Sequence, residues 1–293
     1  MLRRDLLRSF AAAAALRRFA FQSDADRQRL ASWTATLRSD VASDPLSIGP
    51  RAIRVGELAA GSPYVPATLE AYLKAGGSPV ATEPLTLSLT QFDCVTLVEA
   101  CLGVARVAAR PDAPTWERFG VEVEQMRYRG GIRAGYTSRL HYFSEWIGDG
   151  ASRGLVRDLG EELGGEVDPR PLRFMTEHRA SYPALVNDAV FREIGERERS
   201  LDSAVRRLVP VARISSVLDR IQTGDVLAFA TSIPGLDVTH AAFAYRDKQN
   251  VVRVLHAPLS GGVVEVTRAT LPEYVAAIRR ATGILVARPL PGS

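Results

Sequence analysis

The chain of 293 residues has two cysteines and four histidines, and one cysteine stands where it could act as a nucleophile. Cys94 directly follows Asp93, a residue type favoured at the N-cap of a helix. The run CVTLVEACLGVARVAA repeats apolar residues at three- and four-residue spacing, which predicts a buried helix. At such a helix tip, unpaired N–H groups and the helix dipole lower a cysteine pKa and stabilise an oxyanion. The alternative role for Cys94 is a small buried hydrophobic residue, which we predict for Cys101 in mid-helix.

A thiol nucleophile needs a base, and histidine is the usual one. His240 begins the strand-like run HAAFAYR, and His256 lies near the end of VVRVLHA. A three-residue loop over 247–249 would pair Arg246 with Asn250 and set the two histidines opposite each other on one face. A four-residue loop would place them on opposite faces. We predict the first arrangement, with one histidine as base and the other orienting it; the alternative is two unrelated strand histidines.

The elements that must position these side chains change in character along the chain. After Gly224, short β-rich runs separated by turn signals predict an antiparallel sheet. Helices first and a sheet afterwards indicate the α+β fold class. The predicted elements are helices over 25–38, 94–109, 182–209 and 271–280, a short helix or turn over 67–75, a strand over 85–88 and a loop over 151–171.

The charge pattern excludes some classes of function. The 37 basic and 33 acidic residues give a net charge of +4, and the arginines are scattered rather than clustered. A nucleic-acid-binding protein should show basic stripes, so we predict no nucleic-acid partner. The two cysteines lie seven residues apart in the predicted helix, about 10 Å, which is too far for a disulfide. Motifs of the HExxH or paired CxxC type are absent from the sequence, and we predict no metal or other cofactor.

The N-terminal segment has the outline of an export signal. Arg3 and Arg4 precede an alanine-rich run, which predicts a twin-arginine-like signal over residues 1–25 and a periplasmic or cell-envelope location. The alternative is an amphipathic N-terminal helix. The apolar run is only seven residues long, and no stretch of the sequence reaches 18 apolar residues, so we predict no stable membrane insertion. Residues 26–293 are predicted to form a single catalytic domain.

Several motifs, taken in order, resemble a known family. They are GSPYVPATLE from Gly61, FDCVTLVEA from Phe92, YRGGIRAGYTSRLHYFSEW from Tyr128, and THAAF with the later HA. Together they resemble the DUF1460 amidase branch of the NlpC/P60 superfamily of papain-like cell-wall peptidases. The resemblance runs from about Val55 to Pro289. It implies a papain-like core, with the cysteine helix packed on an antiparallel sheet. It also implies a large, mainly helical insertion over about 110–224, which typical compact NlpC/P60 domains lack.

The resemblance also implies roles for individual residues. Cys94 matches the nucleophile, His240 the general base and His256 the third, orienting member. Tyr64 matches a tyrosine beside the oxyanion site, with a packed aromatic side chain as the alternative.

The resemblance further implies that three residues of the motif beginning at Tyr128 line the substrate cleft. They are Tyr136, Arg139 and His141. The planar guanidinium of Arg139 could bind a peptide carboxylate, and the alternative is a structural salt bridge. Glu99 is predicted to be a buried structural partner, and His178 is given no role.

The activity implied by the family is hydrolysis of the bond between N-acetylmuramic acid and L-alanine in peptidoglycan-derived muropeptides, through a thioester on cysteine. One alternative is a γ-D-glutamyl-diamino acid endopeptidase that uses the same machinery on the stem peptide. The others are a non-catalytic cell-wall binding module and a transferase in which an amine replaces water.

Overall fold

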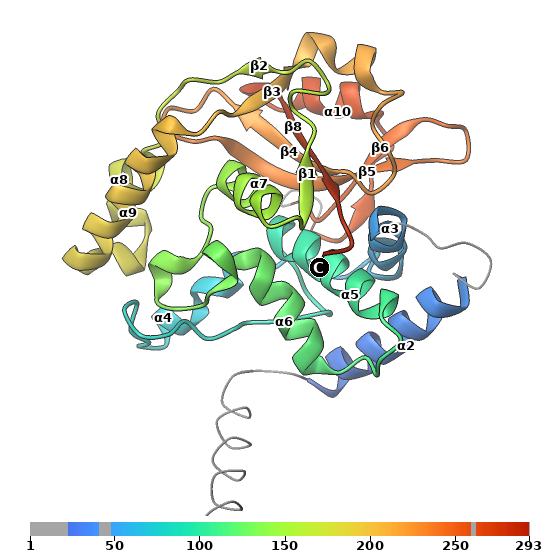
Figure 1. Ribbon diagram of the computed structural model, residues 1–293, viewed down its shortest axis with the longest axis horizontal. Coiled ribbons are helices and arrows are strands. Elements are labelled where there is room, and N and C mark those ends of the chain that lie inside the picture. Colours follow the sequence, from blue (N-terminus) through green and yellow to red (C-terminus); the bar gives the residue numbers. More distant parts are fainter. Residues whose placement is uncertain (1–22, 41–47, 259–261, 293) are drawn as a thin grey trace, which may run out of the picture.

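A computed structural model of the chain describes residues 23–40, 48–258 and 262–292. Nearly all of the predicted export signal, residues 1–22 of 1–25, lies outside the described residues. An antiparallel sheet forms the centre of the molecule, in the order β2-β3-β8-β4-β5-β6-β7, with β1 paired to β8 (Figure 1). The strands are β1 Val156–Asp158, β2 Glu166–Val167, β3 Arg207–Pro210, β4 Val226–Thr231, β5 Val238–Arg246, β6 Val252–His256, β7 Glu265–Val266 and β8 Ala281–Pro289.

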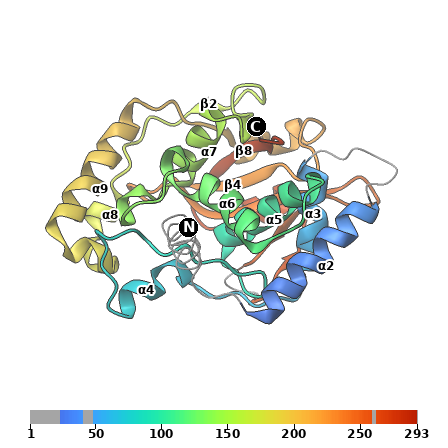
Figure 2. The same ribbon diagram turned by 60° about the horizontal axis from the view of Figure 1, so that its bottom comes forward.

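Helices cover both faces of this sheet. Figure 1 shows α5 on one face and α10 on the other, and Figure 2 shows α2 and α3 toward one end of the molecule, α8 and α9 at the other, and α5 and α6 between them. The helices are α2 Asp24–Asp40, α3 Ile48–Leu58, α4 Ala71–Lys74, α5 Cys94–Ala109, α6 Trp116–Arg127, α7 Phe143–Ser152, α8 Phe174–Glu177, α9 Asp188–Ser200 and α10 Leu271–Ala277. None of these helices is long and apolar enough to cross a membrane.

Alternation along the strands divides the core into two layers. Ala241 and Phe243 of β5 point into the larger cluster, which also holds the buried face of α5. Ala242 and Ala244 point into the cluster on the other face, beneath α10. This period of two is what a sheet buried on both faces requires. The α+β class predicted from the sequence is confirmed.

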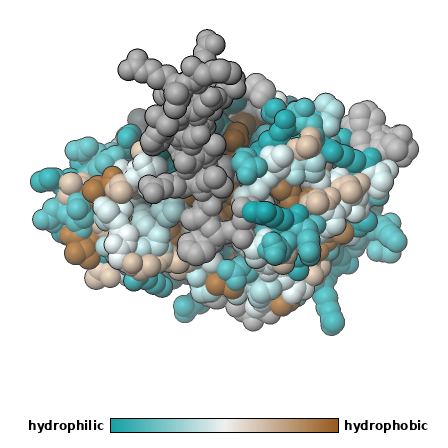
Figure 3. Space-filling model, turned by 90° about the horizontal axis from the view of Figure 1, so that it is seen from below, coloured by the Kyte–Doolittle hydropathy of each residue, from teal (hydrophilic) through white to brown (hydrophobic). Residues whose placement is uncertain are grey.

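The surface away from the core is mixed in polarity. Figure 3 shows hydrophilic residues interspersed with small hydrophobic patches over the visible part of one face. Such a mixture is ordinary for a protein surface in water.

Several predicted elements differ from those observed. No strand forms over 85–88, which has no regular secondary structure. The predicted loop over 151–171 contains β1 and β2, and the predicted helix over 182–209 contains α9 but ends in β3. These strands are only two to four residues long and pair with β8 or with each other, far along the chain. Their formation therefore depends on tertiary pairing rather than on local pattern.

Candidate active site

The N-terminus of α5 is held by a capping box. The Asp93 carboxylate accepts a hydrogen bond from the Thr96 N–H at 2.7 Å, and the Thr96 hydroxyl accepts one from the Asp93 N–H at 2.8 Å. This reciprocal pair satisfies two donors at the helix end and fixes where the helix begins. Cys94 is therefore the first residue of α5, half-buried at its tip, and the predicted helix and N-cap are confirmed.

Backbone N–H groups surround the sulfur of Cys94. Those of Ala241, Val95 and Cys94 itself lower the pKa of the thiol through hydrogen bonds. Ala241 directly follows His240 on β5, so its N–H joins the tip of α5 to the strand that carries the proposed base. Burial and the neighbouring Asp93 carboxylate nevertheless raise the pKa of Cys94 to about 11. The N–H groups at the helix tip lower this pKa as predicted, but the predicted net direction is wrong, because desolvation outweighs the hydrogen bonds.

The two predicted histidines meet across β5 and β6. His240 Nε2 lies 2.9 Å from His256 Nδ1, and the ring centroids are 5.1 Å apart at an interplanar angle of 73°. Burial lowers the pKa of His240 to about 4. Burial and then the His240 charge lower the pKa of His256 to about 3. Both rings are therefore neutral at pH 7, and each carries one donor and one acceptor nitrogen.

The hairpin between β5 and β6 explains this meeting and corrects its predicted register. The structure pairs Arg246 with Val252, and the Asp247 N–H donates to the Val251 carbonyl at 2.9 Å. The loop thus has three residues, 248–250, and Asn250 takes the left-handed conformation with φ of 64°. Because this loop lies one residue later than predicted, the register moves by two, and the two histidines are diagonal neighbours rather than directly opposite. A shift of two residues keeps both on the same face.

Tyr64 is brought beside the tip of α5 by the backbone. It forms a parallel bridge with Phe92, and the Val65 N–H donates to the Phe92 carbonyl at 2.8 Å. Burial, then Cys94 and then Asp93, raise the pKa of the half-buried Tyr64 phenol. The neutral hydroxyl therefore lies in the electrostatic neighbourhood of the thiol.

Tyr274 and Phe229 complete the surroundings of the histidine pair, and sequence reasoning did not find them. The Tyr274 hydroxyl lies 3.2 Å from His256 Nδ1, and the Phe229 ring stacks on His240 at 5.7 Å between centroids. Burial, Glu265 and Cys94 raise the pKa of Tyr274 to about 12. A strand phenylalanine and a helix tyrosine have no motif signal, because only the packing of α10 on the sheet brings them here.

The second predicted motif forms a cluster of its own. The Arg139 guanidinium lies 4.8 Å from the Tyr136 ring centroid, the His141 ring lies 4.5 Å from it, and His141 Nε2 lies 3.0 Å from the Tyr136 carbonyl oxygen. Arg139 is buried and forms ion pairs with Glu70 and, at 3.7 Å, with Glu83. The contacts found among the described residues therefore connect this cluster to the half-buried Glu70 and the buried Glu83 rather than to Cys94.

Electrostatics tie the Arg139 cluster together. Burial alone would lower the pKa of Arg139, but Glu83 and Glu70 raise it above its usual range. Burial and then the Arg139 charge lower the pKa of His141 well below its usual value, so this ring is neutral. A guanidinium already paired in this way would have to break a buried ion pair to bind a substrate carboxylate. The geometry favours the structural salt bridge for Arg139.

The remaining candidates have structural surroundings. Glu99 lies on α5 and forms a buried ion pair with Arg127 at 2.7 Å, as predicted for a structural partner. Cys101 is buried, and burial raises the pKa of its thiol. His178 is exposed, with its ring stacked on Phe174 at 4.0 Å.

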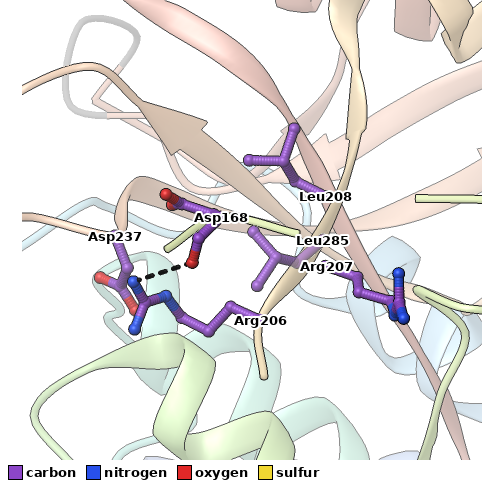
Figure 4. Close-up of a pocket in the computed structure, with 6 residues that line it drawn as sticks. All are labelled: Asp168, Arg206, Arg207, Leu208, Asp237 and Leu285. Atoms are coloured by element: carbon purple, nitrogen blue, oxygen red, sulfur yellow. Dashed lines mark hydrogen bonds between the residues drawn. The ribbon is translucent and has the colours of Figure 1, made fainter. Parts of the chain in front are cut away.

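A pocket near the β2–β3 edge of the sheet lies apart from these residues. Its volume of about 10 Å³ is close to the minimum for one water molecule. Arg206 crosses it and donates to the Asp168 carbonyl (Figure 4). The lining residues are Asp168, Arg206, Arg207, Leu208, Asp237 and Leu285. Its small size makes it a packing defect rather than a substrate site.

Solved structures of similar architecture extend over most of the chain. An N-acetylmuramoyl-L-alanine amidase from Bacteroides uniformis is 29% identical, with a TM-score of 0.75 over 83% of this chain and 99% of that one. A Bacteroides fragilis protein described as a candidate xylanase is 30% identical, with a TM-score of 0.72 over 80% and 99%. A DUF1460 protein from Legionella pneumophila is 19% identical, with a TM-score of 0.63 over 93% and 98%, and shares the fold.

The family comparison covers the site itself. No curated protein sequence matches the chain. Residues 54–284, however, match a family described as AmiA-like, N-acetylmuramoyl-L-alanine amidase-like. This range contains the tip of α5, the histidine pair and the Arg139 cluster. The chain therefore belongs to the N-acetylmuramoyl-L-alanine amidase-like family.

Proposed function

We propose that this protein is a cysteine amidase that hydrolyses the bond between N-acetylmuramic acid and L-alanine in peptidoglycan fragments. One observation carries the proposal. A half-buried cysteine at a capped helix tip accepts a hydrogen bond from the residue that follows His240, and His240 is hydrogen-bonded to His256. A nucleophile, a base and a group that orients the base are the parts that acyl transfer through a covalent intermediate needs.

The protonation states favour a neutral thiol–imidazole pair in the resting enzyme. His240 Nε2 is bonded to His256, so Nδ1 is the ring nitrogen left to accept a proton. It takes the Cys94 proton as the sulfur attacks the lactyl carbonyl carbon. The oxyanion is stabilised by N–H groups at the start of α5, and we assign the Tyr64 hydroxyl to the same role.

The second half of the reaction returns the enzyme to its starting state. The tetrahedral intermediate collapses, the C–N bond breaks and His240 gives its proton to the departing amine of L-alanine. This leaves a thioester between Cys94 and the muramic acid. Water then attacks the thioester carbonyl with His240 as base. The C–S bond breaks, the muramic carboxylic acid is released and the proton returns to the Cys94 sulfur.

We also propose that the core is papain-like and related to the NlpC/P60 superfamily, with 110–224 as a large insertion. The packing of the cysteine-bearing α5 against β5 of an antiparallel sheet supports this core.

We further propose that the N-terminal segment is an export signal that delivers the protein to the cell envelope. A peptidoglycan substrate, as the family description suggests, is consistent with this location.

The alternative activities require different bonds or different groups. A γ-D-glutamyl-diamino acid endopeptidase would use the same three side chains within the stem peptide. A glycosidase, as the name of the Bacteroides fragilis protein suggests, needs two carboxyl groups that face the scissile bond. The carboxylate next to Cys94, that of Asp93, is instead bonded to Thr96 in the helix cap.

Mass spectrometry of defined muropeptides after digestion tests the proposal. We expect free muramyl sugar and an intact stem peptide, and a loss of at least about 10³-fold in kcat for Cys94→Ala. The matched control is Cys101→Ala, which removes the other, buried thiol of α5 and should retain most of the activity. A released dipeptide would assign the endopeptidase instead, and release of reducing sugar from xylan would assign the glycosidase. A Cys94→Ala protein with unchanged rate would refute the cysteine mechanism.

A further inference from the structure

The second ring nitrogen of His256 is buried without a hydrogen bond. His256 is 1% exposed, and its Nε2 has no hydrogen-bond partner among the described residues. A buried polar nitrogen without a partner is uncommon, because it has lost its hydrogen bonds to water without replacing them. The Glu265 carboxylate lies 3.9 Å from this nitrogen, just beyond hydrogen-bonding distance.

The sheet holds Glu265 at this place. His256 and Glu265 are paired residues of the antiparallel strands β6 and β7, so their side chains leave the same face of the sheet. The Glu265 side chain is 49% exposed. It is therefore free to change rotamer and bring an oxygen within bonding distance of Nε2.

The position of one proton on His256 decides whether His240 can act as a base. If Nε2 of His256 carries the proton, Nδ1 accepts from His240 Nε2–H, and His240 Nδ1 keeps its lone pair for the thiol proton. If Nδ1 of His256 carries the proton and donates it to His240, the proton of His240 must sit on its own Nδ1. That nitrogen then cannot accept a proton from Cys94. A neutral imidazole offers no third arrangement.

We propose that Glu265 is a positioning residue that fixes His256 in the Nε2–H tautomer. Its carboxylate accepts the Nε2–H bond, so that His256 presents an acceptor to His240 and His240 presents an acceptor to Cys94. The consequence for catalysis rests on the proposed function of Cys94 and His240. In this tautomer the Tyr274 hydroxyl, 3.2 Å from His256 Nδ1, can donate its hydrogen to the same nitrogen.

Nuclear magnetic resonance of the ¹⁵N-labelled protein tests this directly. Long-range proton–nitrogen correlations at pH 7 distinguish the two tautomers of each histidine, with peaks assigned through single histidine variants. We expect the Nε2–H form of His256 in the wild type and a shift toward the Nδ1–H form in Glu265→Ala. Glu265→Gln should restore the wild-type form, because its amide oxygen still accepts a hydrogen bond. An unchanged His256 tautomer in Glu265→Ala would overturn the proposal.

Kinetics give a second readout. We expect Glu265→Ala to lower kcat about tenfold with KM changed less than about twofold, the scale seen where outer partners fix a histidine tautomer. Glu265→Gln should retain most of kcat, and Glu265→Lys, which offers no acceptor, should behave like alanine. Glu196→Ala is the control, because it removes an exposed acid on α9. A kcat for Glu265→Ala within twofold of wild type, or Glu265→Gln impaired as strongly as Glu265→Ala, would refute the role.

The two readouts separate this inference from the proposed function. The tautomer of His256 is measured without substrate. If the protein cleaved no muropeptide while Glu265→Ala still shifted the tautomer, the function would fall and the positioning role would stand. If the wild type were an amidase and Glu265→Ala left both tautomer and kcat unchanged, only the positioning role would fall.

Discussion

Two side-chain clusters carry the motifs of this protein, and they differ in charge: the first consists of neutral groups and the second of ion pairs. In the first, Cys94, His240 and His256 are neutral, and His256 Nε2 is buried without a hydrogen-bond partner among the described residues. In the second, the Arg139 charge is compensated by Glu70 and Glu83. A neutral thiol and a neutral imidazole can exchange a proton and react with a substrate, whereas a buried arginine whose charge is compensated by two acids is costly to disrupt.

The largest expected effect is a loss of stability on substitution of Arg139, and it tests whether the Arg139 cluster has a structural role. Arg139→Ala leaves Glu83, which is 1% exposed, without its cation. We expect the free energy of unfolding at pH 7 to fall by about 3–5 kcal/mol, as for other buried pairs that lose one partner. Denaturant titration measures this. Arg179→Ala, which removes a surface ion pair with Asp188, should cost less than about 1 kcal/mol.

The KM of the Arg139→Ala variant for muropeptides decides whether Arg139 also binds substrate. If the folded fraction of Arg139→Ala kept its KM for muropeptides, the cluster would be a scaffold. A rise in KM of tenfold or more with unchanged stability would show that Arg139 binds substrate and would break the comparison.

The pH dependence of the reactive cluster is the next effect in size. Because His240 must be neutral to accept the thiol proton and its pKa is about 4, kcat/KM should fall about tenfold per pH unit only below about pH 4. Alkylation of Cys94 by iodoacetamide should rise about tenfold per unit from pH 7 to 10, since its thiol pKa is about 11. Cys94→Ala corrects for reaction at Cys101. An alkylation rate independent of pH over this range would indicate a preformed thiolate–imidazolium pair and contradict the neutral assignment.

The smallest effect concerns Tyr274. Tyr274→Phe removes a hydroxyl that lies 3.2 Å from His256 Nδ1 and leaves the ring packed against His256. We expect kcat to fall about threefold with KM unchanged, in keeping with the net value of one hydrogen bond. The control is Tyr245→Phe, which removes a hydroxyl of β5 that is bonded to Glu57 and not to His256. A loss above a hundredfold would place Tyr274 among the groups that contact the reacting atoms.

Local patterns predicted much of the site and of the fold. The cap at Asp93 and the helix that begins at Cys94 depend on neighbours within a few residues, and both are observed. The longer strands β4, β5, β6 and β8 carry their own apolar patterns and lie in the region after Gly224 where β-rich runs were predicted. The short strands β1, β2 and β3 were not predicted, because their hydrogen-bond partners lie elsewhere in the chain.

The sequence by itself determined which residue types stand at the tip of a helix and near the ends of two strands, since capping and periodicity are local. Only the tertiary structure decided their chemistry. Burial set the thiol of Cys94 and the ring of His240 to their neutral forms, against the expectation from the helix dipole alone. Strand pairing placed Glu265 beside His256, and helix packing placed Tyr274 there. Solvent exclusion and contacts between distant segments exist only once the chain has folded, so no local pattern encodes them.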